Sequence, residues 1–186
     1  MPCQTKELIC AFDLSLVATG FAVNINAGAY TIVSAETLNP PAKMTGIARL
    51  DWILTQVKHR TVGYTEPAVH FVVFEDLAFA AHDRNHERAG LATLIRHMLW
   101  ENRIPFVLVA PTTLKKFTCG SGKADKSQMM LAVFKNWGVT PRNDNEADAI
   151  ALLKLGEALV LPDNTHLPKY QQECLAVVRK SLQYII

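Results

Sequence analysis

The chain has 186 residues, a length that suits a single domain. Apolar side chains make up 49% of it and charged side chains 19%, a composition that can bury a sizeable core and excludes a disordered chain. Because 19 basic residues face 17 acidic ones, the net charge is only +2, and any nucleic-acid-binding surface must be a local concentration of positive charge.

The cysteines and the apolar runs bear on where the protein acts. The four cysteines contain no C-x-x-C pair, which favours reduced thiols over a zinc site: Cys3, Cys10, Cys119 and Cys174. The first residues, MPCQTKEL, lack the apolar stretch of a signal peptide, and the apolar runs are too short to cross a bilayer. We therefore expect a soluble cytoplasmic protein without a membrane partner, in the host cytoplasm if a virus encodes it.

Hydrophobic periodicity predicts strands first and helices later. The runs at 8–12, 20–26 and 30–38 are rich in β-branched and aromatic residues and predict three adjacent antiparallel strands. The continuous apolar runs at 70–77 and 105–111 predict strands buried on both faces. Helical periodicity or helix signals predict the remaining elements at about 44–60, 87–101, 111–117, 127–137, 145–160 and 167–186.

This order of elements predicts the fold class. Strands separated by helices imply right-handed crossovers and a parallel part of the sheet. We expect an α/β protein with a mixed five-stranded sheet, three antiparallel strands followed by parallel ones, and helices on both faces. The main domain is expected over 1–162, with 163–186 as a helical extension of it. In the helix at 87–101 one face is expected to be buried, formed by Leu91, Leu94, Ile95, Met98 and Leu99.

Two acidic residues stand where carboxylates are costly. Asp13 closes the first apolar strand, and Glu75 follows HFVVF in a strand that is expected to be buried. Either residue alone is explained by a buried pair with Arg or Lys, or by a strand end that reaches solvent.

A third acidic residue, Asp148, lies between two alanines in the helix at 145–160, where small side chains allow a close approach to the sheet. Asp144 and Asn145 precede it by four and three positions and can share its face. Either is also an ordinary helix cap. If these acids converge with Asp13 and Glu75, a divalent cation would neutralise them, and their hard oxygen ligands favour Mg²⁺ or Mn²⁺ over zinc. Two such ions would suit phosphodiester hydrolysis.

Four segments in order resemble the RuvC family of Holliday junction resolvases, within the RNase H-like superfamily, including its small phage-type members. They are ICAFDLSLVATGFAV with its D-x-S-x-x-x-T-G-F pattern, VVFEDLAF, TLKKFTCGSGKADKSQM and NDNEADAIALL, and together they span about 8–160. Each motif is weak alone, whereas the four in this order are specific.

The resemblance implies an RNase H-like fold, a homodimer, dependence on Mg²⁺ or Mn²⁺, and nicking of four-way junctions. It implies that Asp13, Glu75 and Asp148 are catalytic metal ligands. Family members often carry Asp or His three residues before the last Asp, where this chain has Asn145, so the fourth ligand is either Asn145 or Asp144.

The segment 115–126 is a candidate DNA-binding loop. Its lysines outnumber its single acid and can neutralise phosphates, although a solvated loop has the same composition: Lys115, Lys116, Lys123 and Lys126. The string GSGKA is not a phosphate-binding Walker loop, because Phe117 stands where that motif needs Gly and Ala124 where it needs Ser or Thr. No nucleotide cofactor is therefore expected.

Beyond Glu75, the resemblance points to Phe79 as an aromatic side chain that probes the junction, where it would stack on an unpaired base. Packing of Phe79 on its own helix is the alternative. His82 and His86 are four residues apart, but no third ligand of suitable spacing accompanies them, so ordinary loop positions or contacts with phosphates are the better interpretations.

The sequence therefore predicts a metal-dependent endonuclease that nicks Holliday junctions and other branched DNA. A two-fold homodimer would place equivalent sites on opposing strands, with 87–101 as its candidate surface. Two alternatives remain open: another RNase H-like nuclease acting on flaps or RNA–DNA hybrids, and a catalytically silent protein that binds branched DNA.

Overall fold

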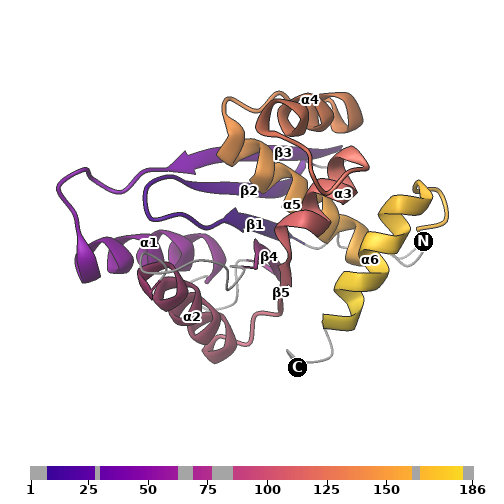
Figure 1. Cartoon of the computed structure of the whole chain (residues 1–186). Helices are drawn as coiled ribbons and strands as arrows, with labels where there is room; N and C mark the ends of the chain where they lie inside the picture. Colours follow the sequence, from indigo (N-terminus) through magenta and orange to yellow (C-terminus); the bar gives the residue numbers. More distant parts are fainter. Residues whose placement is uncertain (1–7, 28–29, 63–68, 77–85, 161–163, 182–186) are drawn as a thin grey trace.

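A computed structural model describes residues 8–27, 30–62, 69–76, 86–160 and 164–181 (Figure 1). The predicted strands and helices are present, with their ends shifted by a few residues; residue 77 and residues 182–186 of the predicted elements lie outside the described residues. They follow in the order β1 (Ile9–Asp13), β2 (Thr19–Ala27), β3 (Tyr30–Leu38), α1 (Gly46–Thr61), β4 (Phe71–Glu75), α2 (His86–Glu101), β5 (Phe106–Val109), α3 (Pro111–Cys119), α4 (Lys126–Trp137), α5 (Asp144–Val160) and α6 (Lys169–Ser181).

The strands form one mixed sheet in the order β3-β2-β1-β4-β5. β1, β2 and β3 pair antiparallel, and β4 pairs parallel with β1 and with β5. The predicted fold class, a five-stranded sheet with an antiparallel start and a parallel remainder, is confirmed. The C-terminal ends of β1 and β4 consequently lie next to each other at one edge of the sheet.

Helices cover both faces of this sheet (Figure 1). α1 and α2 pack on one face over a core that includes Phe12, Ile53, Phe74, Leu91 and Leu99. α3, α4, α5 and α6 belong to the other face, whose core includes Ala11, Val73, Leu114, Ile150 and Leu175. Because strand side chains alternate, each of the central strands β1 and β4 contributes to both cores.

Leu94 departs from the predicted packing of α2. It was expected on the buried face, but its side chain is 44% exposed, whereas Leu91, Ile95 and Leu99 are almost fully buried. At 100° per residue, Leu94 falls at the margin of the arc formed by the buried side chains. Trp100, in the last turn of the same helix, is 70% exposed.

α6 packs against α3 through both polar and apolar contacts. The Gln171 amide nitrogen donates a 2.9 Å hydrogen bond to the Phe117 carbonyl oxygen, and Cys174, Leu175 and Val178 enter the core below. Across the described residues, no helix combines the length and the apolar character that a membrane crossing requires.

The long helix α5 lies against the central strands at very short range. A Cβ atom on Gly156 would lie 2.5 Å from Cγ2 of Val73 in β4, a side chain that is itself fully buried. Only glycine fits at this position without displacing the helix or the strand. This contact fixes the height of α5 above the strands that carry Asp13 and Glu75.

We expect Gly156→Ala to destabilise the protein by about 1–3 kcal/mol, because the added methyl group overpacks a rigid interface. Gly90→Ala is the matched control, since Gly90 also lies within a helix but has open space around its Cα. That change should stabilise by up to about 1 kcal/mol through helix propensity. Urea unfolding of both variants measures the difference, and a Gly156→Ala protein as stable as the wild type would contradict the close contact.

Candidate active site

Asp13 and Glu75 are neighbours at the ends of two parallel strands. Phe12 pairs with Phe74 in the register of β1 and β4, so the two acidic residues are the next positions on adjacent strands. Ile9 and Ala11 of β1, like Val73 of β4, face the core beneath α5. By alternation the two carboxyl groups point toward that same face.

The first turn of α5 reaches the same place. Gly20 of β2 pairs with Asp13, and a Cβ atom on Gly20 would overlap the carbonyl oxygen of Asn145. The helix therefore begins directly above the end of β1, and Asp148 lies one turn further along it. This close approach gives a physical reason for glycine in the T-G-F segment of the sequence motif.

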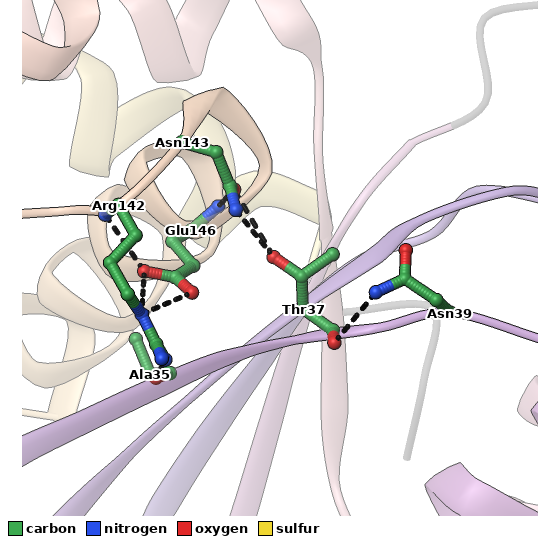
Figure 2. A network of polar contacts seen from close by, with 6 residues as sticks. All are labelled: Ala35, Thr37, Asn39, Arg142, Asn143 and Glu146. Carbon is green, nitrogen blue, oxygen red and sulfur yellow. Dashed lines mark hydrogen bonds and ion pairs between the residues drawn. The ribbon is translucent and has the colours of Figure 1, made fainter.

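A cap fixes the start of α5 on the outer strand β3. The Asn143 side-chain oxygen accepts a 3.0 Å hydrogen bond from the Glu146 backbone N–H, and the Asn143 amide nitrogen donates to the Thr37 hydroxyl oxygen at 2.9 Å (Figure 2). Asn143, rather than Asp144 or Asn145, is therefore the capping residue. Because the cap is supplied by Asn143, the acidic side chains of this turn are left for other contacts.

A buried carboxylate strengthens this attachment. Glu146 is only 3% exposed, and it accepts hydrogen bonds from the backbone N–H of Arg142 at 2.9 Å and from Nε of the same residue. The Arg142 guanidinium also donates to the Ala35 carbonyl oxygen of β3 at 2.9 Å (Figure 2). Glu146 is thus an acid with a structural role, unlike Asp148 two residues later.

Three carboxyl groups of the site have raised pKa values. Burial raises the pKa of Asp13 to about 6, and the negative charge of Asp144 adds to that shift. Burial raises the pKa of Glu75 to about 7, with further repulsion from Asp13 and Asp148. Burial also raises the pKa of Asp148 to about 7, with repulsion from Asp13 and Asp144. The three predicted ligands from β1, β4 and α5 therefore lie close enough to influence one another.

These three carboxyl groups also lack a direct counter-ion. Within the described ranges, no ion pair or side-chain hydrogen bond reaches Asp13, Glu75 or Asp148. The alternative explanation of a buried pair with Arg or Lys therefore does not apply there. Among the described residues, however, no three Asp, Glu, His or Cys side chains stand in an arrangement that could hold a metal ion as it is.

Asp144 behaves differently from the other three. Its carboxylate forms an ion pair with Lys126 of α4, and the hydrogen bond from that ammonium group lowers the pKa of Asp144. Asn145 is half-buried, and its backbone carbonyl packs on Gly20. Of the two candidates for a fourth ligand, Asp144 has a charged side chain at the site and is already engaged by a lysine.

The predicted DNA-binding lysines fall into two groups. Lys115 and Lys126 act on the carboxyl cluster, since the positive charge of each lowers the pKa of Asp148. Lys116 instead forms a 2.9 Å ion pair with Glu173 of α6, and Lys123 is exposed in the loop before α4.

The aromatic and histidine candidates are less informative. Phe79 and His82 lie outside the described residues. His86 is exposed at the start of α2.

Arg88 belongs to the site, although the sequence reasoning did not identify it. Its positive charge lowers the pKa values of Asp13 and Glu75, and one of its terminal nitrogens donates to the Leu14 carbonyl oxygen at 3.4 Å. A signal was present in the sequence, because a cation in the first turn of a helix opposes the helix dipole. A cation at this position is expected to interact with a negatively charged group outside its own helix.

The sequence of this chain matches no family model and no curated protein. Solved structures do match it. RuvC of Thermus thermophilus superposes with a TM-score of 0.62 at 19% identity, over 81% of this chain and 94% of that one. T. thermophilus RuvC in complex with a Holliday junction substrate superposes with a TM-score of 0.61 at 21% identity, over 79% and 90%.

A structure of fowlpox virus resolvase with Holliday junction DNA also matches, with a TM-score of 0.47 at 11% identity over 83% of this chain and 99% of that one. Of these structures, the two from T. thermophilus have the fold of this chain. They confirm, at the level of the fold, the resemblance predicted from the four sequence motifs: this chain has a RuvC-like, RNase H-like fold.

Proposed function

We propose that this protein is a structure-selective endonuclease that nicks Holliday junctions and other branched DNA by divalent-metal-dependent phosphodiester hydrolysis. The observation that carries the proposal is the gathering of Asp13, Glu75 and Asp148 from three separate elements without a direct counter-ion. All three residues are half-buried, and a fold that only needed stability would not hold three carboxylates close together without a counter-ion. Their arrangement is explained if a cation completes the site.

The donor set fits Mg²⁺ or Mn²⁺. Carboxylate oxygens are hard ligands, and the high pKa values indicate groups whose negative charge the protein alone does not compensate. Asp13, Glu75 and Asp148 would hold the ions, two in number by analogy with other phosphodiester hydrolases, and Asp144 would join them if it releases Lys126. The bound ions would supply Lewis-acid stabilisation of the charge that develops on the phosphate.

The residues around the cluster support a DNA strand as the substrate. Lys115 and Lys126 can contact phosphate oxygens and orient the strand without reading its sequence. Their charges also offset the repulsion between the carboxylates and the DNA backbone. The choice of a four-way junction rests on the fold, because the T. thermophilus RuvC structure with the same fold holds a Holliday junction.

A two-fold dimer follows from the same proposal, because a four-way junction presents two equivalent strands. α2 is the candidate surface. It carries a band of exposed side chains in which the rings of His97 and Trp100 lie 6.1 Å apart and Leu94 lies one turn away. Aromatic side chains are enriched in interfaces, although α4 on the other face carries a similar exposed pair, Leu131 and Phe134.

We expect Asp13→Asn to reduce Mg²⁺-dependent nicking of a four-way junction by about 10³-fold or more, because it removes a carboxylate that acts with its neighbours as a unit. Binding to the junction in EDTA should remain within a few-fold of the wild type. Asp51→Asn is the matched control, since it removes an exposed carboxylate from α1.

A substrate panel tests the finer part of the proposal. Matched four-way, flap and RNA–DNA hybrid substrates should be cleaved in that order of preference. A preference for hybrids would identify a different nuclease of the same fold. Binding without any cleavage by the wild type would identify a silent junction-binding protein.

The raised pKa values predict how stability depends on pH in the absence of metal. The folded carboxyl groups bind protons more tightly than the unfolded ones, whose pKa values are about 4. Their stabilising contribution is therefore complete below about pH 4 and is lost as the pH rises through 6 to 7.

In a chelator, we expect the free energy of unfolding of the wild type to fall between pH 5 and pH 8. The free energy of unfolding of Asp148→Asn should exceed that of the wild type by about 1–3 kcal/mol at pH 8 and by less at pH 5. Added Mg²⁺ should stabilise the wild type more than the variant. Chemical denaturation at both pH values measures this, and a variant that is less stable than the wild type at pH 8 would argue against an uncompensated cluster.

For the dimer, we expect Leu94→Asp to weaken self-association by at least about tenfold, because it places a charge in an apolar contact. Sedimentation velocity over a concentration series measures the change. Leu131→Asp on α4 is the control, since Leu131 is similarly exposed at 51% but lies on the opposite face of the sheet. Equal effects of the two substitutions would point away from α2.

A further inference from the structure

Arg88 has hydrogen-bonding capacity that the folded chain does not use. One terminal nitrogen donates to the Leu14 carbonyl oxygen at 3.4 Å, a long hydrogen bond to the residue that directly follows Asp13. Its Nε is buried, and no acceptor for it exists among the described residues. A guanidinium group with one long hydrogen bond and an unpaired buried Nε is poorly compensated, so a stronger acceptor at its terminal nitrogens would stabilise it.

The position of Arg88 suggests what that molecule is. Lys115 and Lys126 belong to α3 and α4, whereas Arg88 comes from α2 on the opposite face of the sheet (Figure 1). Cationic side chains therefore flank the ends of β1 and β4 on both sides. A strand of DNA that crosses these ends would meet positive charge on each side of the carboxyl cluster.

The carboxyl groups of Asp13 and Glu75 do not accept hydrogen bonds from the Arg88 guanidinium. Its charge acts on Asp13 and Glu75, but it forms an ion pair with neither within the described structure. If cations neutralise these carboxylates, the attraction on Arg88 is lost while its N–H groups remain. A phosphate group offers oxygens that match the planar donor geometry of a guanidinium.

We propose that Arg88, which is half-buried, binds a phosphate of the DNA strand that enters the site, from the side of α2, through the terminal nitrogens of its guanidinium group. This assignment rests on the proposed nuclease function. Arg88 is a positioning residue here, because it would hold the strand in place while other groups act on the reacting phosphate.

The test compares Arg88→Gln, Arg88→Lys and Arg96→Gln. Arg96 lies two turns further along α2, and its Nε donates to the Ala92 carbonyl oxygen within the helix, so its replacement removes the same charge away from the site. Binding of a fluorescent four-way junction is measured in EDTA over a series of salt concentrations, together with the thermal unfolding of each variant.

We expect Arg88→Gln to bind about tenfold more weakly, because a charge-assisted hydrogen bond is lost. Its plot of log affinity against log salt should be shallower by about 0.9, the value for one phosphate contact. Arg88→Lys should keep the slope of the wild type and lose part of the affinity, because lysine retains the positive charge but lacks the planar set of donors of a guanidinium group. Arg96→Gln should match the wild type in both quantities.

Two results would overturn the assignment. In one, Arg88→Gln binds with the affinity and slope of the wild type. In the other, it binds more weakly with an unchanged slope and a lowered melting temperature, which identifies Arg88 as a tether for the segment after β1. If the wild type prefers another nucleic acid, the junction specificity fails, and the same three variants measured on that substrate decide the role of Arg88.

Discussion

The close contact between α5 and the sheet determines where the acidic side chains lie. Gly20 and Gly156 leave room for the helix backbone above β2 and β4, and a side chain at either position would collide with a backbone oxygen or a buried valine. Because α5 packs directly on the strands at these two glycines, Asp148 lies over the ends of β1 and β4. A cluster assembled from three elements therefore depends on two positions that carry no side chain at all.

The cluster of carboxyl groups lowers the stability of the folded protein, and contacts elsewhere in the fold have to offset this loss. Burial and mutual repulsion disfavour the charged forms of Asp13, Glu75 and Asp148, so the metal-free protein is less stable at neutral pH than it would be with neutral side chains. The cap at Asn143 and the buried contacts of Glu146 act in the opposite direction, because they attach the same helix turn to β3. Under the proposed function, Glu146 would serve stability and Asp148, two residues later, would serve catalysis.

Much of this arrangement could be predicted from the sequence, because its signals are local. Asp13 and Glu75 stand at the ends of apolar runs, and the mixed sheet with its antiparallel start follows from the alternation of strands and helices. Other features depend on contacts between distant residues. Asn143 caps α5 through the nearby Glu146 N–H, but its hydrogen bond to Thr37, 106 positions away, depends on the tertiary structure. Lys116 faces Glu173 on α6 rather than the carboxyl cluster, and nothing in the local sequence distinguishes it from Lys115.

The position of Arg88 also depends on the tertiary structure and cannot be predicted from the local sequence. Its place in the first turn of α2 is unfavourable on local grounds, but only the tertiary structure puts it beside Asp13 and Glu75. Under the proposed function, Arg88 together with Lys115 and Lys126 on the opposite face would allow a chain with a net charge of only +2 to bind a polyanion. A few cations placed around the carboxyl cluster would attract the DNA backbone there, and a uniformly basic surface would not be needed. Binding that depends on so few contacts should weaken only moderately with salt, since its salt dependence scales with the number of phosphates neutralised.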